Sequence, residues 1–270
     1  MAPAVSRFKP SFWLLLVLFL LVWAVSAACA VALGAIAVPP HELARVLLGG
    51  ANPTDPALAG IATIVWQVRM PRVLLGGLCG LGLAVSGVAW QGVLRNPLAD
   101  PYLIGASAGG ALGAAAAILF GIGGNQPYAV PLLAFVGSLA AVAIVYRLAH
   151  QPGRGLAVDR LVLAGVAVSA FLSACLSLAM LARSESFTRL YFWLIGGFSG
   201  LGWSQLALLA PYVGLSLLGI AYFTPRLNLL QMGEETAHGL GVHVERDRRW
   251  VIALASLLTA AVVSVCGMVG

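Results

Sequence analysis

The fold of this chain is decided by residues 102–146, which read YLIGASAGGALGAAAAILFGIGGNQPYAVPLLAFVGSLAAVAIVY. None of these 45 residues carries a charge. A helix needs about 20 apolar residues to cross the hydrocarbon core of a bilayer, so the stretch is long enough for two crossings. Residues 121–127, GIGGNQP, are rich in turn-forming glycine, asparagine and proline. The stretch therefore predicts two membrane-spanning helices joined by a turn.

The composition extends this interpretation to all 270 residues. Hydrophobic residues make up 61% of the chain and charged residues 9%, whereas soluble domains carry about 25% charged residues. A transmembrane β-barrel would show alternating segments of about 10 residues, and the apolar runs here are longer and unbroken. The cysteines lie in separate apolar runs without a CxxC pair, so we expect small core side chains there. We therefore predict an all-α, polytopic transmembrane bundle.

The apolar runs predict about seven spans. We place them at residues 11–36, 73–94, two within 102–146, 161–182, 203–223 and 250–270. The run 193–203 is glycine-rich and flanked by tryptophans, which indicates an interfacial or re-entrant segment. The first run, preceded by Arg7 and Lys9, also fits a secretory signal peptide, although the apolar core of a signal is shorter, about 7–15 residues.

The distribution of basic residues orients the spans. With the N-terminus inside, the cytoplasmic segments are 1–10, 95–100, 147–160 and 224–249. They hold ten of the 15 basic residues, and the outer segments hold five. This excess follows the positive-inside bias of membrane proteins and predicts a cytoplasmic N-terminus.

No motif for bond chemistry is present. The chain has no GxSxG or HExxH motif, and its single lysine, Lys9, is not part of a Walker A motif. We find no basic stretch interleaved with aromatic residues that would indicate nucleic-acid binding. We therefore expect no enzyme activity, no cofactor, no metal site and no nucleic-acid partner. The spans also lack the ionisable residues that ion-coupled transporters use, which weakens that class without excluding it.

Two polar features interrupt the apolar pattern before the middle of the chain. Pro97 and Pro101 break the helix between two spans, which is typical of a tight turn or of a constriction beside a translocation path. Arg69 and Arg72 are three residues apart and share one helix face at the outer end of the second span. These arginines either snorkel to lipid headgroups or dock an acidic partner.

The longest polar insertion is the segment 227–244, which we expect to form two short helices. Glu234 and Glu235 follow Gly233, as acidic residues do at a helix N-terminus. Gly239 and Gly241 are placed to end that helix. The segment is either an ordinary ordered loop or a protein-docking module.

Glycines recur every four residues at Gly105, Gly109 and Gly113, and again at Gly76 and Gly80. Such spacing places glycines along one helix face, where a neighbouring helix can approach closely. We expect dense helix packing at both places.

Several of these stretches together resemble the FecCD-type permease family, the membrane subunits of ABC importers for iron-siderophores, haem and vitamin B12. The stretches are RMPR at 69–72, VSGVAWQGVLRNPLADP at 85–101, LIGASAGG at 103–110, WLIGGFSG at 193–200 and MGEETAHGLGV at 232–242. They occur in the family's order and cover essentially the whole chain. Family members have about ten spans, so we expect residues 1–270 to be a single permease domain that lacks the family's C-terminal part.

The resemblance implies a permease subunit that performs no bond chemistry itself. Such a subunit forms a homodimer in the bacterial inner membrane. It receives an iron-siderophore, haem or cobalamin-type substrate from a periplasmic or lipid-anchored binding protein, and cytoplasmic ATPase subunits drive it. The alternative from another class is an ATP-independent secondary transporter or channel subunit.

The resemblance also implies roles for individual residues. Asn96, Pro97 and Leu98 match the family's inner gate, and Arg69 and Arg72 match outer residues that dock the binding protein. The cytoplasmic loop 224–249 then couples the ATPase to the bundle. Its coupling residues are Leu229, Leu230, Met232, Gly233, Glu234, Glu235, Gly239, Leu240 and Gly241.

Overall fold

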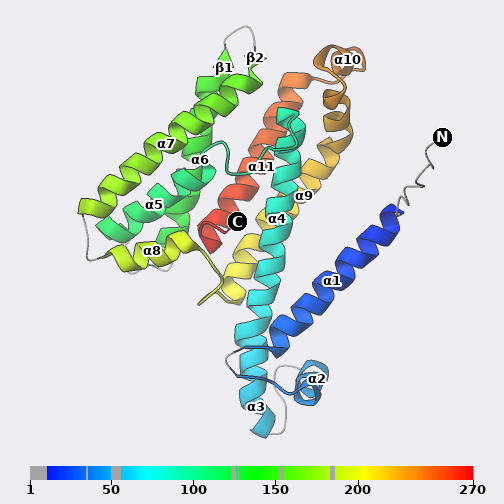
Figure 1. The fold of residues 1–270 in the computed structure, drawn as a ribbon, viewed down its shortest axis with the longest axis vertical. Helices are drawn as coiled ribbons and strands as arrows, with labels where there is room; N and C mark the ends of the chain where they lie inside the picture. Colours follow the sequence, from blue (N-terminus) through cyan, green and yellow to red (C-terminus); the bar gives the residue numbers. More distant parts are fainter. Residues whose placement is uncertain are drawn as a thin grey trace, which may run out of the picture. The chain divides into compact units, whose positions relative to one another are not determined.

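The computed structural model describes residues 11–34, 36–49, 56–122, 126, 128–151, 155–182 and 186–269. In chain order they form α1 (Phe12–Ala32), α2 (Pro40–Gly49), α3 (Pro56–Thr63), the π-helical η1 (Ile64–Arg69), α4 (Met70–Leu94), α5 (Ala106–Phe120), α6 (Ala129–Ala149), β1 (His150–Gln151), β2 (Gly155–Leu156), α7 (Val158–Ala182), α8 (Phe187–Ile195), α9 (Trp203–Gln231), α10 (Glu234–Gly239) and α11 (Val244–Cys266) (Figure 1). The two strands pair antiparallel, with His150 opposite Leu156.

Six helical segments of the described chain are long and apolar enough to cross a bilayer. They are α1, the continuous segment Leu58–Leu94, α6, α7 (within Val158–Leu181), α9 and α11. Helix α5 is also apolar but has only 15 residues, fewer than the roughly 20 that span the hydrocarbon core. The prediction of an all-α polytopic bundle is confirmed, with six long apolar helices and one shorter apolar helix among the described residues.

The largest extensions beyond the predicted spans are those of the second span and of α9. The second span continues back to Leu58, and α9 continues past Arg226 to Gln231. The guanidinium carbon of Arg226 lies 4.9 Å from the centre of the Tyr222 ring and 5.4 Å from that of Phe223. Arg226 therefore packs on aromatic rings of its own helix, and the helix does not end at this charge.

The glycine-rich run 193–203 interrupts the helical pattern, as its composition predicts. Helix α8 ends at Ile195, and irregular backbone follows until α9 begins. Gly196, Gly197 and Gly200 all have positive φ angles there. The backbone N–H of Gly197 donates to the carbonyl of Cys266 at 2.8 Å, so Gly197 lies against the C-terminal end of α11.

The chain divides into two compact units. The first holds the residues up to Leu74 together with Leu201–Trp203, and the second holds Leu75–Gly200 and Ser204–Gly270. In the first unit, Val31, Val46, Ala62 and Val65 form the buried centre. Most side chains of α1 are exposed, as expected of a helix whose apolar surface faces lipid. The prediction of one permease domain stays a prediction.

The second unit is built around the close approach of α5 and α6, which pack side by side with α7 and α11 (Figure 1). A Cβ atom added at Gly109 would overlap the carbonyl of Gly137, and one added at Gly113 would overlap the carbonyl of Leu133. The glycine spacing in residues 105–113 therefore does bring two helices together. The matching expectation for Gly80 is wrong, because a Cβ there would meet nothing within 4 Å.

Buried hydroxyl groups connect helices of the second unit. Ser138 on α6 donates to the carbonyl of Ala106 on α5 at 2.7 Å. Ser86 on α4 donates to the carbonyl of Ala255 on α11 at 3.0 Å, and its hydroxyl lies 2.7 Å from that of Thr259. Such bonds between apolar helices contribute about 1 kcal/mol each.

Candidate functional site

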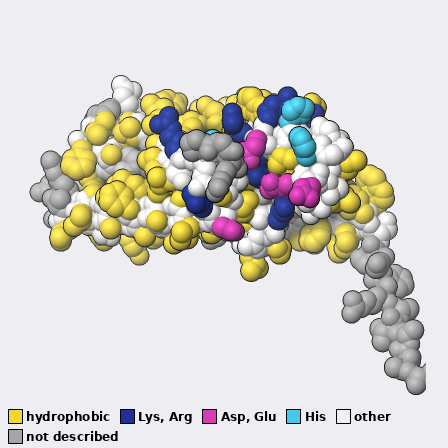
Figure 2. Space-filling model, turned by 90° about the horizontal axis from the view of Figure 1, so that it is seen from above, with side chains coloured by type: hydrophobic (Ala, Val, Ile, Leu, Met, Phe, Trp, Pro, Cys, Tyr) yellow, Lys and Arg dark blue, Asp and Glu magenta, His cyan; other side chains and the backbone are white. Residues whose placement is uncertain are grey.

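Charged side chains gather on the face of the molecule seen in Figure 2. The ion pairs of the second unit join Arg95 to Glu234, Arg226 and Arg246 to Asp247, and Arg248 to Glu234 and Glu245. All of these residues come from segments that the sequence predicts to be cytoplasmic. The structure thus brings the predicted gate turn and the predicted coupling loop to one end of the unit.

The turn after α4 is held by its own polar groups. Helix α4 ends at Leu94, and Arg95 follows with a φ of 49°, in the left-handed region. The side-chain oxygen of Asn96 accepts the backbone N–H of Leu98 at 2.9 Å, which closes the turn locally. The side chain of Leu98 is 87% exposed. An apolar side chain is therefore presented at the tip of an ordered turn.

The predicted coupling loop contains one short helix, α10, rather than two. The expected first helix, which would hold Leu229 and Leu230, is the last turn of α9. The sequence prediction failed there because Pro225 and Arg226 end the apolar run without ending the helix. Leu230 is buried against the bundle, whereas Met232 is 69% exposed and Leu240 is 60% exposed.

Helix α10 begins and ends as its sequence predicts. Glu234 and Glu235 occupy its first turn, where negative charge favours the N-terminus. Beyond its C-terminus, Gly241 has a φ of 84°. The N–H of Gly241 donates to the carbonyl of His238, and the N–H of Val242 to that of Ala237, both at 3.0 Å. This pair of bonds is a Schellman motif, which requires a left-handed residue at the position of Gly241.

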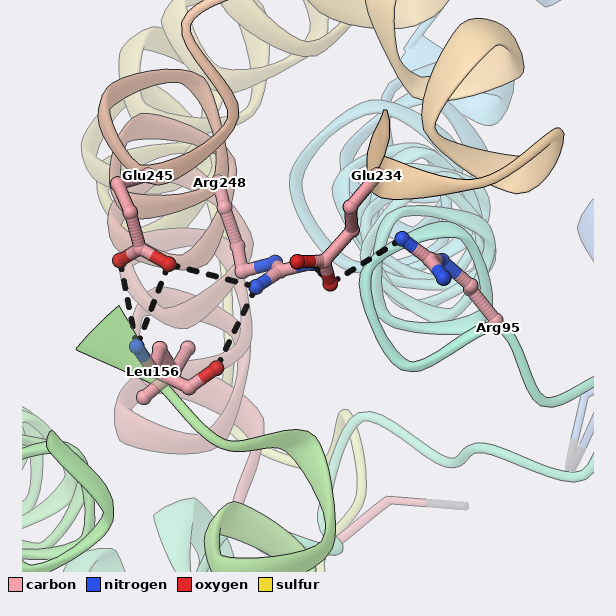
Figure 3. A network of polar contacts seen from close by, with 5 residues as sticks. All are labelled: Arg95, Leu156, Glu234, Glu245 and Arg248. Carbon is pink, nitrogen blue, oxygen red and sulfur yellow. Dashed lines mark hydrogen bonds and ion pairs between the residues drawn. The ribbon is translucent and has the colours of Figure 1, made fainter. Parts of the chain in front are cut away.

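Glu234 connects this segment to two arginines from other helices (Figure 3). Its Oε1 atom lies 2.6 Å from Nη2 of Arg248 and 3.2 Å from Nη2 of Arg95. The hydrogen bond from Arg248 holds the pKa of the Glu234 carboxyl below its usual range, so the group is ionised at neutral pH. One carboxylate therefore lies between the end of α4 and the beginning of α11.

Arg248 is fixed by further partners. Its side chain is 2% exposed, and its Nη1 lies 3.6 Å from Oε1 of Glu245 and 3.4 Å from the carbonyl of Leu156. Both carboxylate oxygens of Glu245 accept the N–H of Leu156 at 3.3 Å. Strand β2 thus belongs to the same network (Figure 3). A buried charge persists only where such partners compensate for lost hydration.

Asp247 is the second buried charge at this end. Its side chain is 3% exposed, and its Oδ1 lies 3.5 Å from Arg226 and 3.4 Å from Arg246. The two pairs join the end of α9 to the beginning of α11.

The two candidate docking arginines lie in the first unit and have different surroundings. Arg69 donates from Nη1 to the carbonyls of Val31 at 2.7 Å and Ala32 at 2.9 Å, and from Nη2 to Ile36. It therefore binds carbonyls in the last turn of α1 and the carbonyl of Ile36, which follows that helix. Arg72 lines the same open cavity of about 480 Å³ as Arg69. Its buried Nε has no hydrogen-bond partner among the described residues.

Residues 15–270 match the family model described as the FecCD transport family. The chain belongs to this family. A match of this extent includes the turn after α4, the α10 segment and the arginines of the first unit.

Relatives and a solved structure support the assignment to the FecCD family. The chain is 32% identical over 256 residues to the uncharacterised ABC transporter permease YvrB of Bacillus subtilis, covering 92% of this chain and 71% of the relative. It is 38% identical over 210 residues to the cobalamin import permease BtuC of Halobacterium salinarum, covering 77% and 55%. It is 36% identical over 207 residues to the vitamin B12 import permease BtuC of Escherichia coli O157:H7, covering 76% and 62%.

The fold agrees with these relatives. A structure described as an inward-facing conformation of a metal-chelate type ABC transporter matches with a TM-score of 0.80 and 29% identity, over 95% of this chain and 77% of that one. The chain thus spans between about half and three quarters of the length of the proteins it resembles.

The sequence analysis of this FecCD family member missed three residues of the site, namely Arg95, Glu245 and Arg248. Arg95 and Arg248 were counted only as basic residues of cytoplasmic segments, and Glu245 was not considered. Charged side chains are almost never fully buried, and the sequence gives no sign that Arg248 is an exception. The signal that was available is the charge density of residues 245–249 at the beginning of a span. Within the described ranges, no cluster of three or more His, Cys, Asp or Glu side chains could hold a metal ion.

Proposed function

We propose that this chain is the membrane-spanning permease subunit of an ABC importer. The observation that carries the proposal is its likeness to permeases of cobalamin and vitamin B12 import over 77% and 76% of the chain, and to a metal-chelate type transporter over 95% of it. The substrate is then an iron-siderophore, haem or a cobalamin-type compound. The chain would offer a path through the membrane and would leave ATP hydrolysis to a separate subunit.

The assembly that we propose contains two copies of the permease, cytoplasmic ATPase subunits and a binding protein that delivers the substrate. The permease lies in the bacterial inner membrane, with its N-terminus and the loop 224–249 in the cytoplasm. The basic residues of that loop support this orientation. Cysteines introduced into the loop should not react with impermeant reagents added to intact cells, and ready labelling would reverse the orientation.

Uptake into proteoliposomes tests the function. The full-length gene product is reconstituted with its ATPase and binding protein and supplied with vitamin B12, haem or a ferric siderophore. We expect uptake of one of these classes of substrate. The uptake should require ATP on the side of the ATPase subunits, and it should stop when a non-hydrolysable analogue replaces ATP. Uptake that proceeds without an ATPase would favour the secondary transporter or channel instead.

The α10 segment is the proposed docking site for the ATPase. Met232 and Leu240 flank α10 as exposed apolar side chains, and Glu235 is exposed beside them. Exposed apolar side chains bounded by charges are typical of surfaces that bind another protein. Leu230 and Val242 are buried, so in this proposal they support the segment from within and do not contact the partner.

Arg72 is the better of the two candidates for docking the binding protein. We expect Arg72→Glu to slow capture of the binding protein about tenfold at low salt, since charges at an interface rim act mainly on the association rate. The effect should shrink as salt screens the charges. Capture is measured as the association rate at two ionic strengths.

Arg72→Lys is the matched control, because it keeps the charge, and it should retain most of the association rate. Arg69→Glu should instead lower the thermal stability, because it removes the donor to two carbonyls in the last turn of α1 and to the carbonyl of Ile36. An unchanged rate for Arg72→Glu at low salt would assign Arg72 to lipid headgroups.

Leu98 is proposed to meet its counterpart in the second copy at the inner gate. Its exposure supports this, since an apolar tip on an ordered turn favours burial against a partner. In a variant freed of native cysteines, Leu98→Cys should give a covalent dimer under mild oxidation, to an extent that depends on nucleotide. Leu98→Ala should raise the leak of small solutes several-fold by removing apolar contact from the closed gate.

Leu148→Cys serves as the control for cross-linking, because Leu148 is also exposed but lies at the end of α6. It should give little dimer. Absence of a Leu98→Cys dimer in every nucleotide state would remove Leu98 from the dimer axis.

A further inference from the structure

The carboxylate of Glu234 reaches the two arginines Arg95 and Arg248, although about half of its side chain (49%) remains exposed. Figure 3 shows its carboxylate between Arg95 and Arg248. Glu235, the next residue in the same helical turn, has no ion pair within the described part of the chain. The two adjacent carboxylates therefore have different surroundings, although nothing in the sequence distinguishes one from the other.

The two arginines that share Glu234 differ in burial and in the number of their contacts. Arg248 is buried on a long helix and is tied to Glu245 and to strand β2. Arg95 is one third exposed and has the ion pair with Glu234 as its described charge contact. Glu234 thus connects a fixed group with a group on a short turn.

A small displacement of Arg95 would reach the turn that presents Leu98. Arg95 directly precedes Asn96, whose side chain closes the turn that presents Leu98. Arg95 also has a left-handed backbone, which costs a non-glycine residue free energy and persists only where the surroundings enforce it. The ion pair of Arg95 with Glu234 is one of the contacts that can hold this backbone conformation.

We propose that Glu234 is a positioning residue that transmits movement of the α10 segment to the turn at residues 95–98, through its shared ion pairs with Arg95 and Arg248. The inference rests on the proposed function, in which the ATPase moves α10 and the turn forms the gate. Arg248 holds the segment in register on α11, and Arg95 follows the carboxylate. Neutralising Glu234 separates the docking segment from the gate without removing either one.

Coupling of ATP hydrolysis to uptake tests this role. The full-length permease is reconstituted with its ATPase and binding protein, and the amount of substrate taken up per ATP hydrolysed is measured. Glu234→Gln keeps the size and removes the charge, so it should lower this ratio about tenfold, the range expected for losing one coupling contact. Binding of the ATPase should stay close to wild type, and the thermal midpoint of the complex should fall by only a few degrees, because Arg248 keeps its contacts with Glu245 and the carbonyl of Leu156.

The controls separate coupling from folding and from charge in general. Asp159→Asn makes the same chemical change at an exposed position at the beginning of α7 and should leave the ratio within twofold of wild type. Arg95→Gln alters the more exposed partner and should lower the ratio as Glu234→Gln does. The amount of substrate taken up per ATP in the double variant should be no lower than in Glu234→Gln, since both substitutions remove the ion pair between Arg95 and Glu234.

The possible failures are distinguishable. Wild-type complex without ATP-dependent uptake would refute the proposed function. Wild-type coupling together with an unchanged ratio in Glu234→Gln or Arg95→Gln would refute the transmission role alone. Loss of ATPase binding in Glu234→Gln would place Glu234 at the partner's surface and would also overturn it.

Discussion

Replacing Gly113 by alanine is expected to separate α5 from α6 and to abolish the native packing of the second unit. The added methyl group would overlap the carbonyl of Leu133, much closer than the 3.0 Å that real Cβ atoms keep. Both obstructing atoms are backbone, so no side-chain rotation relieves the contact. Overpacking of this kind costs about 3 kcal/mol or more when the backbone must shift. Thermal unfolding in detergent should show a midpoint at least several degrees lower, or no monodisperse protein.

Gly80→Ala is the matched control. Gly80 also lies inside a long apolar helix, but a Cβ there meets nothing within 4 Å. Because alanine favours helix by about 1 kcal/mol over glycine, this variant should be as stable as wild type or slightly more stable. Equal midpoints for Gly113→Ala and Gly80→Ala would contradict the close approach of α5 and α6.

Replacing Gly241 by valine is expected to uncouple ATP hydrolysis from uptake or to prevent the ATPase from binding. Gly241 has a φ of 84° in the Schellman motif that ends α10. A β-branched residue rarely adopts this conformation, and forcing it costs about 1–3 kcal/mol. The chain after α10 would then leave in another direction and displace Leu240 from the proposed docking surface. ATPase co-purification and uptake in proteoliposomes measure the result.

Asparagine at position 241 tests the cause, since it tolerates the left-handed conformation better than other non-glycine residues. Gly241→Asn should therefore retain most of the uptake that Gly241→Val loses. Gly239 has an ordinary φ and open space around its Cα, so valine there lacks this source of strain. Wild-type uptake and ATPase binding in Gly241→Val would show that residues 227–244 tolerate change as an ordinary loop does.

Features of the backbone were accessible from the sequence because they depend on residues close together in the chain. The 45 charge-free residues at 102–146 predicted two helices, and the structure has α5 and α6 there. Proline and glycine limit φ locally, which explains why the break after α4 and the end of α10 were predicted at the right places. Helix lengths were predicted less well, since Arg226 could pack on aromatic rings and leave α9 unbroken.

The glycine pattern shows how far such local information extends. Gly109 with Gly113 and Gly76 with Gly80 have the same spacing, and both predicted a tight helix crossing. Only the first pair has a helix against it at backbone distance. Spacing marks a face that can be approached, whereas the partner that approaches is chosen by the packing of the whole unit.

By itself, the sequence determined that this chain is a helical membrane protein, where most of its helices lie and where the backbone must turn. These properties follow from the length of apolar runs and from the restricted conformations of glycine and proline. The tertiary structure was needed to show that Glu234 joins Arg95 to Arg248, that Arg69 binds the end of α1 and that the buried Nε of Arg72 has no hydrogen-bond partner among the described residues. The physical reason is that burial and ion pairing depend on which distant segments meet, and a charged residue looks the same in sequence whether it is buried or exposed to water.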